Sequence, residues 1–242
     1  MKPVLFLLSH AGGNAAQYAY LFSALRGHFE LVPLELPGHG ERTGEPLLYT
    51  ISDMTRDVIE QMRRALGKSR ARHERRPDYA VFGHSLGSLL GYLASAALAG
   101  EGHPPAHLFV SSACIPGQHY VPENFPKLSA DALWQASAAH FGGIPQEALN
   151  SQELQRYFAP LLQADLGAVV NYKPAALPAL ASPVTAFYGT DDTVEKADVE
   201  KWRRFTTGAF QCHCLDGGHF YLFQHGPALA ERILAELEAQ SA

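Results

Sequence analysis

The stretch Tyr79-Ala80-Val81-Phe82-Gly83-His84-Ser85-Leu86-Gly87 joins an apolar run to the pattern Gly-x-Ser-x-Gly. The apolar run predicts a buried strand, and residues 88–94 continue as a predicted helix. In a strand–turn–helix of this kind, the glycines permit a tight turn that lifts the serine hydroxyl above the sheet. Ser85 is therefore the candidate nucleophile, and the alternative is a serine in an ordinary glycine-rich turn.

Short apolar runs of this kind alternate along the chain with longer segments of helical periodicity. Strands are predicted at residues 4–8, 31–36, 79–82, 107–111, 184–188 and 211–215. Most of these runs are apolar throughout, as expected for strands that are buried on both faces of a parallel sheet. The sequence therefore predicts an α/β protein with a mostly parallel central sheet that is flanked by helices.

The composition of the 242 residues excludes several other classes. With 47% hydrophobic and 18% charged residues, the chain is neither a disordered nor a coiled-coil sequence. A net charge of −5 argues against nucleic acid as a partner. No apolar run reaches the roughly 18 residues of a membrane span, so no membrane partner is expected. The three cysteines form no Cys-x-x-Cys pair, which favours a reducing, cytoplasmic location and argues against a metal site.

Residues 117–173 interrupt the alternation, because they contain amphipathic helical pieces and no convincing strand pattern. A segment of this length is too long for a plain connection between two strands, and long insertions commonly act as lids. We expect a helical lid within a single domain that spans residues 1–242; alternatively, these helices only cover a face of the sheet. The side chains expected to line a substrate pocket are Trp134, Phe141, Tyr157 and Phe158.

A serine nucleophile needs a base and an acid that orients the base, and in this fold they follow in the order Ser, Asp or Glu, His. The predicted strand at 184–188 is followed by Asp191 and Asp192, and the one at 211–215 is followed by His219 between glycine and apolar residues. His219 is the candidate base. Asp192 is the favoured acid, and Asp191 remains the alternative.

Acyl transfer also needs backbone donors for a developing oxyanion. The glycine-rich loop after the first predicted strand precedes a helix, so its N–H groups could face Ser85. We expect the two donors to be the backbone N–H groups of Ala11 and Leu86. A phosphate-binding loop is the competing interpretation, but neither Gly-x-Gly-x-x-Gly nor Gly-x-x-x-x-Gly-Lys-Ser/Thr is present.

Five strings of this chain, in their order and spacing, resemble the type II thioesterases of nonribosomal peptide and polyketide synthesis. They also resemble the medium-chain thioesterase that acts with animal fatty acid synthase. The strings are His10-Ala11-Gly12-Gly13, Pro37-Gly38-His39-Gly40-Glu41-Arg42, Phe82-Gly83-His84-Ser85-Leu86-Gly87, Gly189-Thr190-Asp191-Asp192 and Gly217-Gly218-His219-Phe220-Tyr221-Leu222. The resemblance covers almost the whole chain.

This resemblance implies an α/β-hydrolase fold with a helical lid. It also implies hydrolysis of acyl groups from the phosphopantetheine arm of an acyl or peptidyl carrier protein, with an editing role and without a cofactor. The chain departs from the family pattern at His39, where an Arg is common, at Leu86, where a Met is common, and at Leu93, where a Glu is often found. None of these departures changes the proposed proton transfer, because Leu86 would contribute only its backbone N–H. A monomer is the simplest expectation.

Two other functions remain open at this point. A carboxylesterase or lipase would use the same catalytic residues, because these residues do not distinguish a sulfur from an oxygen leaving group. A non-catalytic module that binds carrier proteins is disfavoured by the presence of all three candidate residues.

A basic stretch stands out in the otherwise acidic chain. Seven of the fourteen residues from Arg63 to Arg76 are Lys or Arg. One interpretation is a solvated loop before the strand at 79–82. The other is a docking surface for an acidic carrier protein, through Arg70, Arg72, Arg75 and Arg76.

Overall fold

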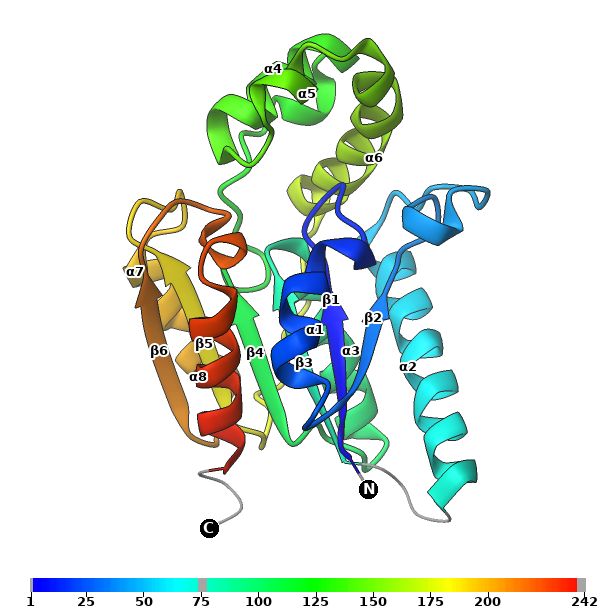
Figure 1. Ribbon diagram of the computed structural model, residues 1–242, viewed down its shortest axis with the longest axis vertical. Helices are drawn as coiled ribbons and strands as arrows, with labels where there is room; N and C mark the ends of the chain where they lie inside the picture. The colour runs from blue at the N-terminus through cyan, green and yellow to red at the C-terminus, as the bar shows by residue number, and fades with distance from the viewer. Residues whose placement is uncertain (1, 74–77, 239–242) are drawn as a thin grey trace.

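Six parallel strands form the centre of the computed structural model, which describes residues 2–73 and 78–238 (Figure 1). Their order across the sheet is β2-β1-β3-β4-β5-β6, and every neighbouring pair is parallel. The strands are β1 (Val4–Leu8), β2 (Glu30–Leu34), β3 (Tyr79–His84), β4 (His107–Ser111), β5 (Val184–Gly189) and β6 (Phe210–Leu215). The predicted α/β class is confirmed, and the predicted strands lie within two residues of the observed ends.

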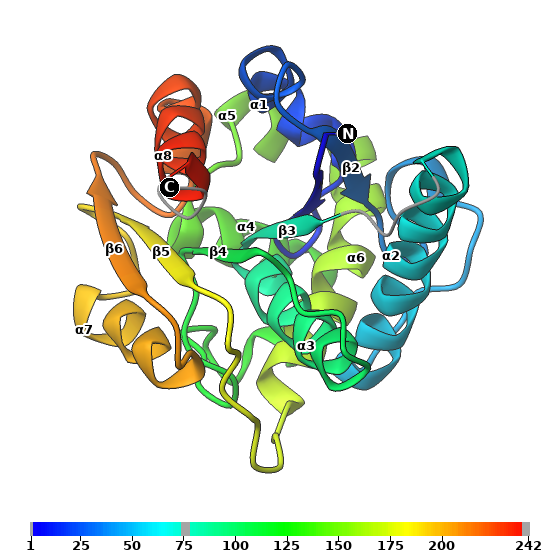
Figure 2. The same cartoon turned by 90° about the horizontal axis from the view of Figure 1, so that it is seen from below.

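Two layers of helices cover the sheet (Figure 2). On one face lie α1 (Ala19–Leu25) and α8 (Gly226–Glu238); on the other lie α2 (Ile51–His73), α3 (Leu86–Gly100) and α7 (Lys196–Val199). Successive strand residues point to opposite faces, so Leu5 and Leu7 pack with α1 and α8, whereas Val4, Phe6 and Leu8 join the core beneath α2 and α3. The central strands are therefore mostly apolar on both faces. Short 3₁₀ helices are η1 (Ala15–Tyr18), η2 (Gly40–Arg42), η3 (Phe125–Lys127), η4 (Glu200–Phe205) and η5 (Tyr221–Phe223).

Helix α2 corrects one interpretation of the basic stretch. Residues 63–73 continue the helix and do not form a loop. The reason is that a buried stripe ending at Leu66 and Ser69 faces the protein, while charged residues such as Arg64 stay exposed on the opposite side of the same turns. The side chains of Arg70 and Arg72, and all of Arg75 and Arg76, lie outside the described residues.

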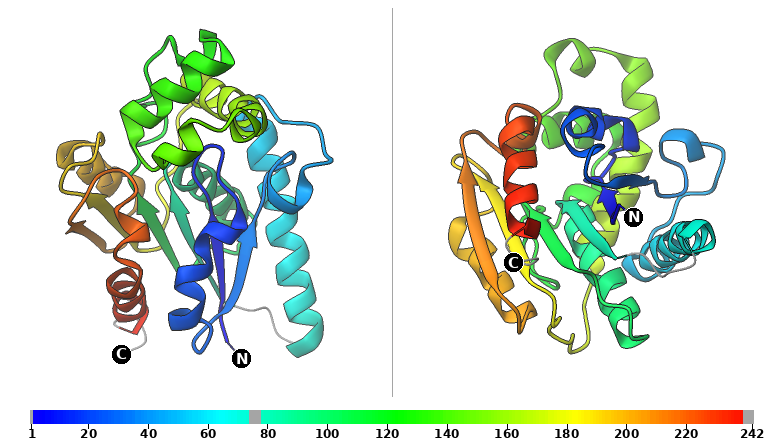
Figure 3. Two further views of the ribbon diagram at one scale, coloured as in Figure 1. Left: turned by 45° about the horizontal axis from the view of Figure 1, so that its top comes forward. Right: turned by 60° about the horizontal axis from the view of Figure 1, so that its bottom comes forward.

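A third group of helices lies above the carboxyl ends of the strands (Figures 1 and 3). Between β4 and β5 the chain forms η3, α4 (Ala130–Phe141), α5 (Gln146–Leu149) and α6 (Gln152–Asn171). Ser129 and Ser151 start α4 and α6 as N-caps, since their hydroxyls accept backbone N–H groups of the first turn. These helices have a small core of their own, made by Val121, Phe125, Leu133, Trp134, Leu162 and Leu166.

No described helix combines the length and the apolar character that crossing a lipid bilayer requires.

The turn between β3 and α3 brings three backbone segments unusually close. Ser85 has φ 55° and ψ −118°, a backbone conformation that few non-glycine residues adopt, and its N–H donates to the carbonyl of Ser111 at 2.8 Å. A Cβ atom at Gly83 would lie 2.2 Å from the carbonyl oxygen of Gly87, and one at Gly87 would lie 2.2 Å from that of Leu8. Only glycine fits at both positions.

We expect Gly87→Ala to lower the free energy of unfolding by about 2–4 kcal/mol, because the added methyl group must displace backbone. Gly100→Ala is the matched control, since a Cβ atom at Gly100 meets nothing within 4 Å. This control should leave stability unchanged or raise it by less than about 1 kcal/mol. Urea unfolding measures both variants, and equal stability of the two would contradict the close approach.

Candidate active site

Three loops at the carboxyl ends of the strands bring Ser85, Asp192 and His219 together. Ser85 follows β3, Asp192 follows β5 and His219 follows β6. The Nδ1 atom of His219 lies 2.9 Å from Oδ1 of Asp192, and both side chains are almost completely buried. Because parallel strands end at the same edge of the sheet, residues far apart in sequence meet here.

Asp192 is held as a carboxylate by several donors. Burial alone would raise its pKa, but the hydrogen bonds with His219, Ser112 and the amide of Val194 outweigh burial and lower the pKa below its ordinary value. Ser112 Oγ donates to Oδ2 at 2.5 Å, and the Val194 N–H donates to Oδ1 at 3.1 Å. Asp192 is therefore ionised at neutral pH and can orient an imidazole N–H.

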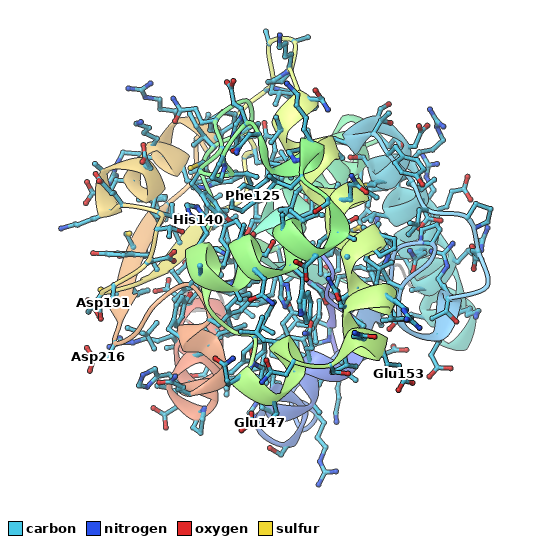
Figure 4. All side chains as sticks on the ribbon, turned by 90° about the horizontal axis from the view of Figure 1, so that it is seen from above. Phe125, His140, Glu147, Glu153, Asp191 and Asp216 are labelled. Carbon is cyan, nitrogen blue, oxygen red and sulfur yellow. The ribbon has the colours of Figure 1, made fainter. Side chains whose placement is uncertain are left out.

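Asp191, the alternative acid, is not the hydrogen-bond partner of His219. Its side chain is exposed and, like that of Asp216, projects from the edge of the molecule away from the helices above the sheet (Figure 4). Thr190 Oγ1 donates to it at 3.1 Å. The carboxylate beside His219 is that of Asp192.

The hydroxyl of Tyr120 lies between Ser85 and His219. Tyr120 Oη is 2.6 Å from Ser85 Oγ and 3.3 Å from Nε2 of His219, and it also donates to the carbonyl of Ser112 at 3.2 Å. Burial raises the pKa of the Tyr120 phenol far above its ordinary value, so this hydroxyl is neutral. The sequence motifs identified neither Tyr120 nor Ser112.

The residues that carry the two predicted oxyanion donors, Ala11 and Leu86, line the same cavity as Ser85. Within the described part of the chain their N–H groups donate to no protein acceptor. The neighbouring Gly12 N–H is already occupied, because it donates to Oδ2 of Asp165 at 2.7 Å. Asp165 belongs to α6, so the helices above the sheet hold the loop that carries Ala11.

Asp165 also pairs with His39, one of the positions at which the sequence departs from the type II thioesterase pattern. Oδ2 of Asp165 is 3.0 Å from Nε2 of His39, and both side chains are buried. Burial alone would lower the pKa of His39, but the hydrogen bond and the negative charge of Asp165 outweigh burial and raise it. This pair is the second connection between α6 and the loops below it.

Two further histidines near His219 are neutral. Burial lowers the pKa of His10 to about 4 and that of His84 well below its ordinary value. Nδ1 of His84 lies 2.8 Å from Ser111 Oγ, and Nδ1 of His10 lies 2.9 Å from the carbonyl of Ala11. Both rings therefore support the site without adding charge to it.

A cavity of about 230 Å³ opens from Ser85 toward the helices above the sheet. Three of the four side chains predicted for a substrate pocket, Trp134, Phe141 and Phe158, line this cavity. The prediction for Tyr157 was wrong: this residue does not line the cavity and is 41% exposed, because adjacent residues of a helix point about 100° apart and Phe158 takes the inward position. No Asp, Glu, Lys or Arg is found among the described lining residues.

The described residues contain no cluster of three or more His, Cys, Asp or Glu side chains that could hold a metal ion.

A parallel sheet with a strained serine turn after one strand and a His–Asp pair after two others defines the α/β-hydrolase class. The family model of the thioesterase domain matches residues 3–237, and the chain belongs to this family. It is 32% identical over 223 residues to the medium-chain S-acyl fatty acid synthase thioesterase of Rattus norvegicus, with 88% of this chain and 79% of that protein aligned.

Solved structures agree with this assignment. ClbQ from the colibactin NRPS/PKS pathway matches with a TM-score of 0.88 at 26% identity, over 100% of this chain and 99% of that one. RedJ, a thioesterase from the prodiginine pathway of Streptomyces coelicolor, matches with a TM-score of 0.82 at 33% identity, over 98% of this chain and 85% of that one. The predicted resemblance to thioesterases is confirmed.

The His39–Asp165 pair generates a prediction about pH. Since the pKa of His39 is raised in the folded protein, the stabilisation by this pair is fully present below about pH 6.5 and is lost as the pH rises through the raised value. We expect Asp165→Asn to lower the free energy of unfolding by about 3 kcal/mol at about pH 6 and by clearly less at about pH 9.

Urea unfolding of both proteins at the two pH values measures this difference. Asp216→Asn is the control, because it removes the same charge from an exposed position. An equal loss at both pH values for Asp165→Asn would contradict a charged His39.

Proposed function

We propose that this thioesterase hydrolyses acyl thioesters on the phosphopantetheine arm of acyl or peptidyl carrier proteins, as an editing type II enzyme. The observation that carries the proposal is the buried His219–Asp192 pair beside the strained Ser85, at the mouth of an uncharged, mostly apolar cavity. Such a cavity fits an acyl chain without charged groups. The names of the related ClbQ and RedJ structures place those proteins in biosynthetic pathways that support this choice of substrate.

In the proposed reaction, Ser85 Oγ attacks the thioester carbonyl carbon and loses its proton, while Nε2 of His219 gains a proton as the general base. Asp192 keeps Nδ1 of His219 protonated and stabilises the imidazolium. The N–H groups of Ala11 and Leu86 hold the oxyanion of the tetrahedral intermediate. The imidazolium protonates the departing thiolate, and His219 then activates the water that releases the acyl group from Ser85.

The helices between β4 and β5 form the proposed lid within a single domain. They supply the cavity side chains Trp134, Phe141 and Phe158, and they place Asp165 on the loop of Ala11. The chain would act as a monomer in the cytoplasm and needs no cofactor for this chemistry. The basic end of α2, with Arg70 and Arg72, is the proposed contact for the acidic carrier protein.

An esterase or lipase activity on oxygen esters is the alternative function. Acyl release from a loaded carrier protein, compared with hydrolysis of an oxygen ester of the same acyl group, separates the two. A higher kcat/KM for the carrier-bound thioester supports the proposal, and a higher value for the oxygen ester contradicts it.

We expect Ser85→Ala to abolish labelling by a fluorophosphonate probe and to lower kcat for acyl release by at least about 10³-fold, because the nucleophile is lost. Ser52→Ala is the control, since Ser52 is exposed on α2. Mass spectrometry locates the label, and steady-state kinetics give kcat. A label on Ser85 of the wild type that is absent in Ser85→Ala would exclude the binding module. Labelling that persists in Ser85→Ala would show that another residue reacts and would contradict Ser85 as the nucleophile.

The role of the acid is tested by the pair Asp192→Asn and Asp191→Asn. We expect Asp192→Asn to lower kcat by about 10⁴-fold, because an amide no longer fixes the tautomer of His219 or stabilises its charged form. Asp191→Asn should retain nearly full activity, since its carboxylate is exposed. Measured kcat values in the reverse order would make Asp191 the acid.

A further inference from the structure

The position of Tyr120 raises a question about how the proton leaves Ser85. Among the described residues, the side chain that forms a hydrogen bond with Ser85 Oγ is Tyr120, at 2.6 Å. The same hydroxyl oxygen lies 3.3 Å from His219 Nε2, and no hydrogen bond joins Ser85 Oγ to His219 directly among the described residues. A phenol hydroxyl can accept one proton and donate another, so it can connect the two groups.

Tyr120 is held in this place from several sides. His140 Nε2 lies 3.1 Å from the Tyr120 carbonyl oxygen. The Tyr120 ring packs edge-on against Phe141 with 5.7 Å between ring centres, and lies tilted against the His219 ring with 5.3 Å between ring centres. His140, which belongs to α4, lies beside Phe125 of η3 with 5.5 Å between ring centres (Figure 4). The hydroxyl is therefore positioned by α4 and does not depend on the loop alone.

We infer that Tyr120 is a catalytic residue that relays the proton from Ser85 to His219; the inference rests on the proposed Ser85 nucleophile. As Ser85 Oγ forms its bond to the acyl carbon, its O–H bond breaks and the proton passes to Tyr120 Oη. In the same step the original Tyr120 proton passes to Nε2 of His219. The phenol is neutral before and after, the imidazole becomes imidazolium, and no other reactant is needed.

The hydrogen bond to Ser112 fits this relay. The Ser112 carbonyl is 3.2 Å from Tyr120 Oη and accepts the phenol proton in the resting state. When the serine proton approaches, the phenol proton can turn to His219, whose Nε2 lies at a similar distance. Ser112 thus contacts both ends of the system, since its hydroxyl also donates to Asp192.

The test is Tyr120→Phe, which removes only the hydroxyl and keeps the ring between Phe141 and His219. Tyr49→Phe is the matched control, because Tyr49 is 67% exposed. Two rates are measured: reaction with a fluorophosphonate probe, and acylation by an acyl thioester in a rapid-mixing experiment. We expect Tyr120→Phe to slow both by about 10- to 100-fold with little change in KM, whereas the control keeps both rates.

A proton inventory in mixtures of H₂O and D₂O adds a readout that a purely structural role would not change. The relay moves two protons in one step, so the acylation rate of the wild type should depend on the deuterium fraction along a curve. Tyr120→Phe should give a straight line. Equal or faster rates in Tyr120→Phe, with an unchanged inventory, would overturn the relay and leave Tyr120 as a cover over Ser85.

Fluorotyrosine at position 120 serves as the second variant, because it keeps the hydroxyl and the packing but makes the phenol more acidic. A relay predicts changed labelling rates and a shifted pH profile, and a covering role predicts neither. A wild type that is labelled at Ser85 but hydrolyses no thioester contradicts the proposed function alone, and the labelling rates still decide for or against the relay.

Discussion

The turn at Ser85 fixes how β1, β3, β4 and α3 pack against one another. Its glycines let the first turn of α3 lie against the ends of β1 and β3, and the Ser85 N–H donates to the end of β4. Ser88, one turn into α3, reinforces the arrangement, since its hydroxyl lies within hydrogen-bond distance of the carbonyls of Gly83 and Ser111. A strained backbone conformation persists only where surrounding contacts over-determine it. The position of Ser85, the proposed nucleophile, is thus fixed by contacts with the central strands of the sheet.

Burial determines the charge of the histidine ring next to His219, that of His84. The ring centres of His84 and His219 are 5.0 Å apart. If His84 carried a charge, it would raise the energy of a His219 imidazolium by about 3 kcal/mol at an effective dielectric constant of about 20. A barrier higher by this amount would slow a reaction more than a hundredfold. Burial instead keeps His84 neutral, so in the proposed reaction the ionised Asp192 is the charged group that stabilises a His219 imidazolium.

The sheet and the loops that carry Ser85, Asp192 and His219 could be predicted from the sequence, because continuous apolar runs and turn glycines are local signals. The contacts of Tyr120 and Asp165 could not be predicted, because they depend on how the helices between β4 and β5 pack against the loops at the end of the sheet. Tyr157 shows the same limit within one helix: composition identified an aromatic pair, but only packing decides which member points inward. The last turns of α2 were not predicted for another reason. Beyond Leu66 and Ser69 the sequence has no apolar residues at helical spacing, and a dense run of charged residues is typical of a loop as well as of a helix.

Asp165 of α6 connects the helices above the sheet to two loops at the carboxyl ends of the strands, those of Gly12 and His39. It is 153 residues from Gly12 and 126 from His39, yet one of its oxygens accepts from both. Hydrogen bonds to a buried charged group contribute about 1.5–3 kcal/mol each, so lifting α6 away from both partners costs about 3–6 kcal/mol. A state with α6 lifted is then populated to less than about 1%. Because the Gly12 N–H donates to Asp165, the proposed oxyanion donor of this loop is the adjacent N–H of Ala11, and α6 holds the loop that carries it.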